Sequence, residues 1–538
     1  MNESGINIPG KKGSTIGTKY DWNFTTVAQP GVNGRVLPTT RGKVLGGSSA
    51  LNLMTWDRGS VVDYDAWQEL GSPGWNWTTM IDSMLKVETF TGANTSSYGS
   101  AGVGHSGPID TVINRVIPTQ QDTWIPTMEK LGIPHNLESL GGNPLGVMNQ
   151  PSNINSSDYV RSYSANGYLP LARQNLHTRI NTTVAKVDLK KKKGILSATG
   201  VVLSCGTTIT ARKEVILSAG SIQSPGLLEV SGIGQTTVLS AAGIRPLLEL
   251  PGVGENLQDH LRVETSYQLK PNYTSYDFLK NTTYAAQQLA LYNADQVSEY
   301  DYTGSGYSYM NWAQVLGNDS VIVSLAKQAV QKNNTVDAKK LEYLTTERGQ
   351  EVGQVEVIFS DGYTGVKGYP TANSTLFGKG FFTLIAVIQH PLSRGSVHIN
   401  ATNPSGKPII NPNYASNEYD IQSLIEAAKF GRKIATTPPM SETWLNEYEP
   451  GLDAVQTDAQ WREYVLKTAL SIYHPLGTCA LLPLKDGGVV DPDLVVYGTS
   501  NLRVVDASII PILPTAHLQT AVYGVAEMAA DIIVRHWS

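Results

Sequence analysis

Residues 41–59 read Arg-Gly-Lys-Val-Leu-Gly-Gly-Ser-Ser-Ala-Leu-Asn-Leu-Met-Thr-Trp-Asp-Arg-Gly, with a glycine pair and two serines ahead of an apolar segment. Glycine has no Cβ, so the pair at 46 and 47 allows another group to approach the backbone closely. Four more short motifs follow along the chain. They read Gly220-Ser-Ile-Gln-Ser-Pro-Gly-Leu-Leu-Glu-Val-Ser-Gly-Ile-Gly234, Val253-Gly-Glu-Asn-Leu-Gln-Asp-His260, Pro391-Leu-Ser-Arg-Gly-Ser-Val397 and Asn501-Leu-Arg-Val-Val-Asp-Ala-Ser508.

The order of these five motifs resembles that of the glucose-methanol-choline (GMC) family of flavin oxidoreductases, in its fungal glucose-oxidase-like and aryl-alcohol-oxidase-like branch. The resemblance implies an α/β fold, in which a Rossmann-like FAD-binding domain is interleaved with an α+β substrate domain that has an antiparallel sheet. We expect residues 1–60, 161–265 and 465–538 to form the FAD-binding domain. Residues 61–160 and 266–464 would form the substrate-binding domain.

Hydrophobic alternation supports this division of the chain. It predicts strands at 180–189, 198–204 and 207–217 on the FAD side, and at 354–359, 380–387 and 395–399 in the substrate domain. A strand at 502–505 ends at Asp506, and residues at the carboxyl end of such a strand line the ligand crevice of a doubly wound sheet. Residues 273–312 are rich in aromatic side chains and form either a lid over the pocket or ordinary packing.

Two histidines near the end of the chain are the candidate catalytic residues. His474 lies in Tyr-His-Pro-Leu-Gly-Thr-Cys and His517 in Pro-Thr-Ala-His-Leu-Gln-Thr. One imidazole can accept a hydroxyl proton while the other donates a hydrogen bond to the same oxygen. Taken alone, the two residues are more simply structural histidines. The family resemblance implies that His474 is the general base and His517 its hydrogen-bond partner, although either ring could hold the proton.

The resemblance also implies which residues contact FAD, some at the flavin ring and others near the adenine or in the closing segment. These positions are Gly46, Gly47, Ser48, Asn52, Val184, Ala219, Asp506, Ala507 and Leu518. The alternative for Asp506 is an ordinary helix or turn cap. Leu51 stands where some relatives carry a flavin-linking histidine, so no covalent bond to FAD is expected there. No metal site is expected.

The family's first cofactor-binding unit has no counterpart in this sequence. Family members begin with a strand, a Gly-x-Gly-x-x-Gly turn and a helix whose N-terminus holds the pyrophosphate of FAD. No such motif precedes Arg41. We therefore expect that the N-terminal βαβ unit is missing and that the chain as written binds FAD poorly.

Composition argues against nucleic acid and a membrane as binding partners. A net charge of -5 with 16% charged residues argues against nucleic acid, and no apolar stretch is long enough to span a membrane. Twelve Asn-x-Ser/Thr acceptors favour a glycosylated, secreted protein. They begin at Asn2, Asn23, Asn76, Asn94, Asn155, Asn181, Asn272, Asn281, Asn318, Asn333, Asn373 and Asn400.

The reaction implied by the family is oxidation of the CH–OH group of a small-molecule alcohol. A histidine removes the hydroxyl proton, the substrate carbon transfers a hydride to flavin N5, and oxygen or another acceptor reoxidises the flavin. The many tyrosines favour an aromatic or polyketide-like alcohol, with carbohydrate as the alternative. Two other functions stay open: a non-redox cyclase or lyase on the same fold, and an inactive truncated family member. Oxidase or dehydrogenase chemistry and the oligomeric state are also left open.

Overall fold

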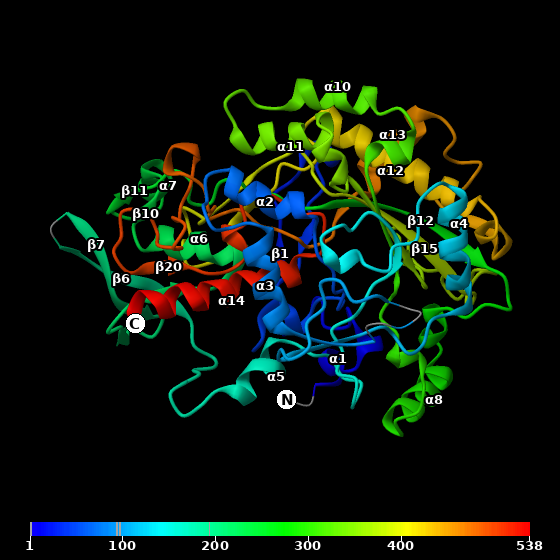
Figure 1. Cartoon of the computed structure of the whole chain (residues 1–538), viewed down its shortest axis with the longest axis horizontal. Helices are drawn as coiled ribbons and strands as arrows, with labels where there is room; N and C mark the ends of the chain where they lie inside the picture. The colour runs from blue at the N-terminus through cyan, green and yellow to red at the C-terminus, as the bar shows by residue number, and fades with distance from the viewer. Residues whose placement is uncertain (1–2, 93–94, 96–97, 193) are drawn as a thin grey trace.

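Two large clusters of buried apolar side chains organise the chain. The computed structural model describes residues 3–92, 95, 98–192 and 194–538 (Figure 1). One cluster surrounds an antiparallel sheet. The other joins helices α2 (Val61–Glu69), α3 (Trp77–Val87) and α14 (Leu518–Trp537) to short strands. The clusters agree with a two-domain chain, and the domain boundaries stay a prediction.

The larger sheet has six antiparallel strands, in the order β13-β14-β15-β12-β18, with β19 also paired to β12. Their bounds are β12 Leu261–Leu269, β13 Gly306–Met310, β14 Val355–Ser360, β15 Phe381–Ile388, β18 Trp444–Glu449 and β19 Leu470–Ser471. Helix α12 (Glu418–Ala435) packs on β12 and β15, because Leu424, Ile425 and Ala428 lie on one helical face. The whole of β15 is therefore buried, as its sequence predicts, since it is apolar except for Thr383.

A short parallel pair lies on the other side of the molecule, near α14 (Figure 1). Strand β9 (Val215–Leu217) pairs in parallel with β20 (Leu502–Val504), and helix α6 (Gly220–Val230) begins just after β9. The neighbouring antiparallel strands are β6 (Val184–Lys192), β7 (Ile195–Leu203) and β8 (Thr208–Thr210). The single strand predicted at 207–217 is thus two strands in different sheets. The break falls at the polar segment 211–214, which leaves one sheet before joining the other.

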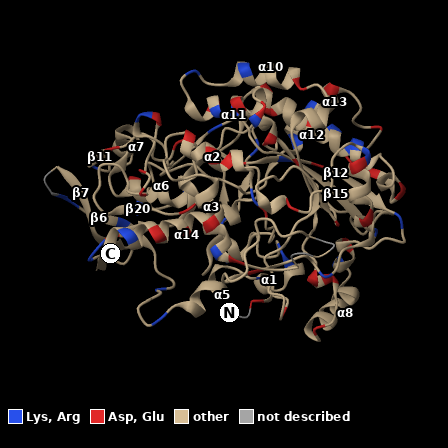
Figure 2. Cartoon of the chain, in the orientation of Figure 1, with Lys and Arg blue, Asp and Glu red and all other residues tan. Residues whose placement is uncertain are grey.

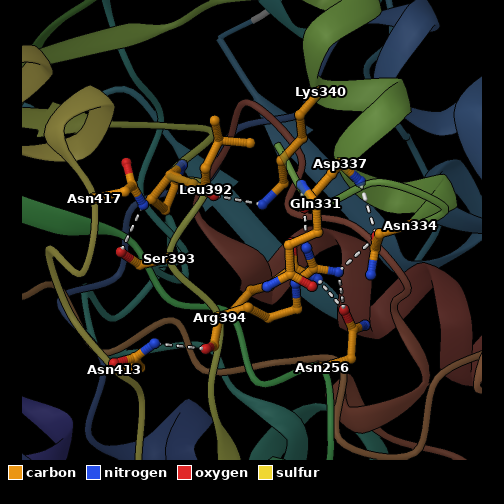
Figure 3. Close-up of polar contacts among 12 residues, drawn as sticks. Asn256, Gln331, Asn334, Asp337, Lys340, Leu392, Ser393, Arg394, Asn413 and Asn417 are labelled. Atoms are coloured by element: carbon orange, nitrogen blue, oxygen red, sulfur yellow. Dashed lines mark hydrogen bonds and ion pairs between the residues drawn. The ribbon is translucent and has the colours of Figure 1, made fainter. Parts of the chain in front are cut away.

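Arg394 ties two of the sequence motifs to helix α11 (Thr335–Thr345), as Figure 3 shows. Its guanidinium forms an ion pair with Asp337 and donates to Asn334 Oδ1 at 2.9 Å. The same Nη1 lies 3.4 Å from Asn256 Oδ1. Arg394 is almost wholly buried, so these polar contacts compensate the loss of water around its charge.

The motif at 253–260 also pairs with the motif at 391–397 through backbone atoms. The amide of Leu257 donates to the Gly395 carbonyl at 2.9 Å, and the reverse bond is also 2.9 Å long. A Cβ on Gly395 would lie 1.8 Å from the carbonyl oxygen of Asn411, so only glycine fits at this position. These two motifs therefore shape the backbone that carries Asp259 and His260.

Charges of both signs are interspersed over α11, α12 and α13 (Asp458–Thr468) in the view of Figure 2. No helix in the described part of the chain is long and apolar enough to cross a membrane. Two of the predicted glycosylation acceptors, Asn2 and Asn94, lie outside the described residues, and the asparagines of the others are exposed or half-buried.

Arg58 of the first motif forms a buried ion pair beside Asp57. Arg58 and Glu88 are both wholly buried, and Nη2 of Arg58 lies 2.7 Å from Oε2 of Glu88. The glutamate also accepts hydrogen bonds of 2.9 Å from the Thr111 hydroxyl and the Gly104 amide. Because both charges have several polar partners, the pair can hold the backbone next to Asp57 in place.

Removing one partner of this pair should be costly. We expect Glu88→Ala to lower the free energy of unfolding by about 3–5 kcal/mol, because it leaves a buried guanidinium without its counter-ion. The matched control is Lys86→Ala, which breaks an exposed ion pair with Asp531 and should cost less than about 1 kcal/mol. Urea denaturation followed by fluorescence measures both. Equal losses in the two variants would show that the buried pair does not support the fold.

Candidate active site

His474 and His517 lie against each other, although forty-two residues separate them in the chain. Their ring centroids are 4.9 Å apart and the planes are almost perpendicular. His474 follows strand β19, and His517 is the residue immediately before helix α14. Both residues are half-buried, so each ring keeps some exposed surface. The structure therefore brings the two predicted catalytic residues together.

A buried aspartate holds the backbone of each histidine. The His474 amide donates to Asp259 Oδ1 at 2.8 Å, and the His517 amide donates to Asp57 Oδ1 at 2.9 Å. The second carboxylate oxygens differ in their contacts. Oδ2 of Asp259 accepts from the Tyr414 hydroxyl at 2.5 Å, whereas Oδ2 of Asp57 lies 2.8 Å from Nδ1 of His517. Of these two aspartates, only Asp57 contacts an imidazole ring.

Two carboxylates and a phenol surround the ring of His517. Oε1 of Glu356 lies 3.6 Å from Nδ1, and the Tyr309 hydroxyl lies 2.7 Å from Asp57 and 3.1 Å from Glu356. Burial lowers the pKa of His517, but the charges of Glu356 and Asp57 outweigh it and raise this pKa to about 9. Burial also raises the pKa of Glu356 to about 7, against the charge of His517. The ring of His517 is therefore cationic near neutral pH.

The ring of His474 has a neutral neighbour instead. Its Nδ1 lies 3.0 Å from Nδ1 of His260, which is wholly buried. Burial lowers the pKa of His474 well below its usual value, and the positive charge of His517 lowers it further. Burial likewise lowers the pKa of His260 to about 3. Both rings are therefore neutral near pH 7, and one Nδ1 donates a hydrogen bond to the other.

The glycine turn of the first motif is fastened to both histidine loops. Arg41, before the turn, donates from its guanidinium to the backbone carbonyl of Tyr473, the neighbour of His474. Asn52, after the turn, donates to the side chain of Gln519 at 2.7 Å, two residues beyond His517. The turn of the first motif is thus linked to the two loops that carry the predicted catalytic residues.

The shape of this turn fits the flavin that the motif implies. Gly46 and Gly47 have φ values of 95° and 55°, a conformation that favours glycine. A Cβ on Gly47 would meet no atom within 4 Å, and Ser48 is exposed. One side of the turn is therefore open, so its backbone can approach a planar ring closely.

Asp506 caps two helical segments. One carboxylate oxygen accepts the Gly220 amide at 2.9 Å, and the other accepts the Ser508 amide at 2.8 Å. The capping alternative is therefore observed, and a contact with FAD stays a prediction. The other predicted cofactor positions differ in exposure: Ala219 is exposed, Ala507 and Val184 are half-buried, and Leu518 is buried.

Four residues of this site were not singled out from the sequence. Asp57 and His260 lie inside motifs quoted above, where their acidic and imidazole side chains were a usable signal. Glu356 is a carboxylate in a strand that is otherwise apolar up to the serine at its end, which is also unusual enough to notice. Tyr309 belongs to the aromatic-rich segment that we expected to form a lid or ordinary packing. Its place beside His517 depends on strand pairing and has no local signal.

The ligand-type atoms of Asp57, Glu356 and His517 lie within 4.8 Å of one another, close enough to surround a metal ion. Each of these groups already has hydrogen-bond partners within the protein, such as the bond of 3.0 Å from Gln389 to Glu356. We therefore interpret the cluster as a hydrogen-bonded network around a cationic ring.

Models of the GMC oxidoreductase family match residues 11–262 and 391–526 of the chain. A GMC oxidoreductase family protein of Malassezia sympodialis, Mala s 12, is 37% identical over 97% of this chain and 84% of its own length. The chain belongs to the GMC oxidoreductase family.

Two solved structures of similar proteins agree with this assignment. An FAD-dependent oxidoreductase from Chaetomium thermophilum has a TM-score of 0.89 with 27% identity, over 100% of this chain and 93% of its own. A fungal aryl-alcohol oxidase has a TM-score of 0.82 with 27% identity, over 97% and 90%. The predicted family, fold class, oxidoreductase class and cofactor type are confirmed. The individual site residues of this GMC oxidoreductase stay predictions.

The neutral, buried His260 should make this GMC oxidoreductase sensitive to acid. Its pKa in the folded chain, about 3, is below the value of about 6.5 in the unfolded chain. The unfolded chain therefore binds a proton below pH 6.5 that the folded chain excludes, and stability is lost as the pH falls. At pH 5 this loss amounts to about 2 kcal/mol.

The variant His260→Gln should remove that contribution. We expect the decrease in unfolding free energy between pH 7 and pH 5 to be smaller by about 2 kcal/mol in His260→Gln than in the unmodified chain. The control, His105→Gln, changes an exposed ring and should leave the pH dependence unchanged. Urea denaturation at the two pH values gives both quantities. An unchanged acid sensitivity in His260→Gln would mean that His260 is protonated in the folded chain.

Proposed function

We propose that this chain is an FAD-dependent oxidoreductase that oxidises the CH–OH group of a small-molecule alcohol, with oxygen or another compound as the final electron acceptor. The observation that carries the proposal is the contact between two imidazoles with different partners, His474 beside the ring of His260 and His517 beside the carboxylate of Asp57. When bound, FAD would accept the hydride from the substrate carbon. The protein groups must then take the hydroxyl proton and stabilise the oxygen that loses it.

His474 suits the role of general base. Its Nδ1 faces His260, so Nε2 is the nitrogen left for the substrate. In the tautomer whose Nδ1–H donates a hydrogen bond to Nδ1 of His260, Nε2 of His474 has a free lone pair.

His517 suits the role of hydrogen-bond donor. Its Nδ1 is occupied by Asp57, so only Nε2 can face a substrate. In the cationic ring this nitrogen carries a proton, which can donate to the substrate oxygen as negative charge develops there. The charge of His517 also keeps the pKa of His474 low, so the two roles reinforce each other.

The relatives and the groups beside the histidines support a substrate class. The structural neighbour named an aryl-alcohol oxidase supports an alcohol donor. The ring of Tyr307 lies 5.8 Å from that of His517, edge to face. Such an aromatic wall suits an aromatic alcohol, and it also suits the apolar face of a sugar. We favour an aromatic alcohol because of the many tyrosines in the chain.

We also propose that the chain is a secreted glycoprotein. The support is the set of Asn-x-Ser/Thr acceptors, whose described asparagines all reach the surface at least in part. An exposed acceptor is accessible to the glycosylation machinery, whereas a buried one is not.

The variant His474→Ala tests the catalytic assignment. In protein supplied with FAD, we expect turnover of an aryl alcohol to fall by roughly two to four orders of magnitude, the usual effect of losing a general base. The flavin absorbance should persist, because the glycine turn is unchanged. An unchanged rate would remove His474 from the mechanism.

Anaerobic reduction separates redox chemistry from the cyclase or lyase alternative. We expect an alcohol substrate to bleach the absorbance of bound flavin in the absence of oxygen. Persistent yellow colour together with conversion of the substrate to an isomer or elimination product would favour the non-redox alternative. The His105→Ala variant, changed at an exposed site, is the control for both measurements.

A further inference from the structure

We propose that Asp57 is a positioning residue that keeps His517 doubly protonated and thereby fixes it as the hydrogen-bond donor of the site. The catalytic meaning of this inference rests on the proposed function. The protonation of His517 can be measured independently of any activity, so the two can fail separately.

The first support is the two-point contact between the carboxylate and the histidine. Oδ1 of Asp57 accepts the backbone amide of His517 at 2.9 Å, and Oδ2 lies 2.8 Å from its ring Nδ1. Two contacts on one residue fix both the position of the backbone and the rotation of the ring. Nδ1 must carry a proton to bond to a carboxylate, so Nε2 is the atom whose protonation Asp57 controls.

The second support is the need of Asp57 for a positive partner. Its side chain is 1% exposed, and a buried carboxylate is costly without a counter-ion. Within the described residues, the ion pair found for Asp57 is the one with His517. The adjacent Arg58 forms its ion pair with Glu88 instead. A neutral His517 would therefore leave the charge of Asp57 uncompensated.

The third support is the place of His517 at the beginning of helix α14. The amino end of a helix carries partial positive charge, which disfavours a cation and favours an anion. Asp57 accepts the amide at this end of the helix, so the helix stabilises the ionised carboxylate. The helix by itself would oppose a cationic His517, so a carboxylate on the ring is needed to maintain it.

Glu356 is the less suitable partner for the same ring. The titratable groups facing His517 are Asp57, Glu356, Tyr309, Tyr307, His474 and His260. Both carboxylates accept from the Tyr309 hydroxyl, and Glu356 also accepts from Gln389. Only Asp57 also accepts the His517 amide, and it lies 2.8 Å from the ring nitrogen, whereas Glu356 lies 3.6 Å from it. Two neighbouring carboxylates do not both ionise easily, so the better-bonded one holds the charge.

Asp259 provides the matched comparison. It accepts the backbone amide of His474 at 2.8 Å, as Asp57 does for His517, but its other oxygen bonds to the Tyr414 hydroxyl rather than to an imidazole. Replacing either aspartate by asparagine removes a buried charge and one anchor of a histidine loop. Only the replacement of Asp57 removes a charge from the ring of His517.

Histidine-selective 15N NMR of the full chain supplied with FAD tests the proposal, with His517→Gln used to assign the signal. In the unmodified chain, His517 should stay protonated until about pH 9. In Asp57→Asn its titration should move down by about 1–3 pH units, the usual effect of removing a charge at this distance. In Asp259→Asn it should not move, and Asp57→Glu should retain the protonated ring at pH 8.

Three results would overturn the proposal. They are a His517 that titrates near pH 6.5 in the unmodified chain, a titration that Asp57→Asn leaves unchanged, and an equal shift in Asp259→Asn. The first does not depend on Asp57→Asn, so it decides the matter even if that variant does not fold. Where alcohol oxidation is measurable, the alkaline limb of kcat/KM should move down with the NMR titration. An Asp57-dependent protonation in a chain that oxidises no alcohol would contradict the proposed function alone.

Discussion

Two imidazole rings in contact cannot easily carry positive charge at the same time, and this constraint orders the whole site. The rings of His474 and His517 are 4.9 Å apart, so the surroundings of each decide which is charged. A carboxylate lies on the ring of His517, and a neutral, buried imidazole lies on that of His474. The site therefore has a proton acceptor, His474, beside a hydrogen-bond donor, His517, although both side chains are imidazoles.

The fold supplies these surroundings from distant parts of the chain. Asp57 comes from the first motif, Tyr309 and Glu356 from adjacent strands of the large sheet, and His260 from the residue just before β12. Tyr309 and Glu356 stand directly opposite each other in the register of β13 and β14. The sheet is buried on both faces at this point, so the phenol and the carboxylate have little freedom to turn away from His517.

Local patterns explain what could be predicted from the sequence and what could not. The apolar run of β15 is a local signal, and the strand lies within one residue of its predicted position. The histidines were found because their motifs resemble those of a family. The partners of His517 were missed because they depend on long-range strand pairing and on the folding of residues 41–59 beside the C-terminal loops. The predicted cofactor positions share no common degree of exposure, since Ala219 is exposed and Leu518 is buried. Asp506 caps two helical segments, a role that its sequence motif did not exclude.

The attachment of the glycine turn to both histidine loops has a mechanical consequence. Arg41 holds the turn to the loop of His474, and Asn52 holds it to the beginning of α14. A displacement of the turn would therefore pull on both loops together and alter the spacing of the two rings. In a chain built this way, a movement of the cofactor-binding turn and a movement of the proton-handling groups would be coupled through one connected backbone.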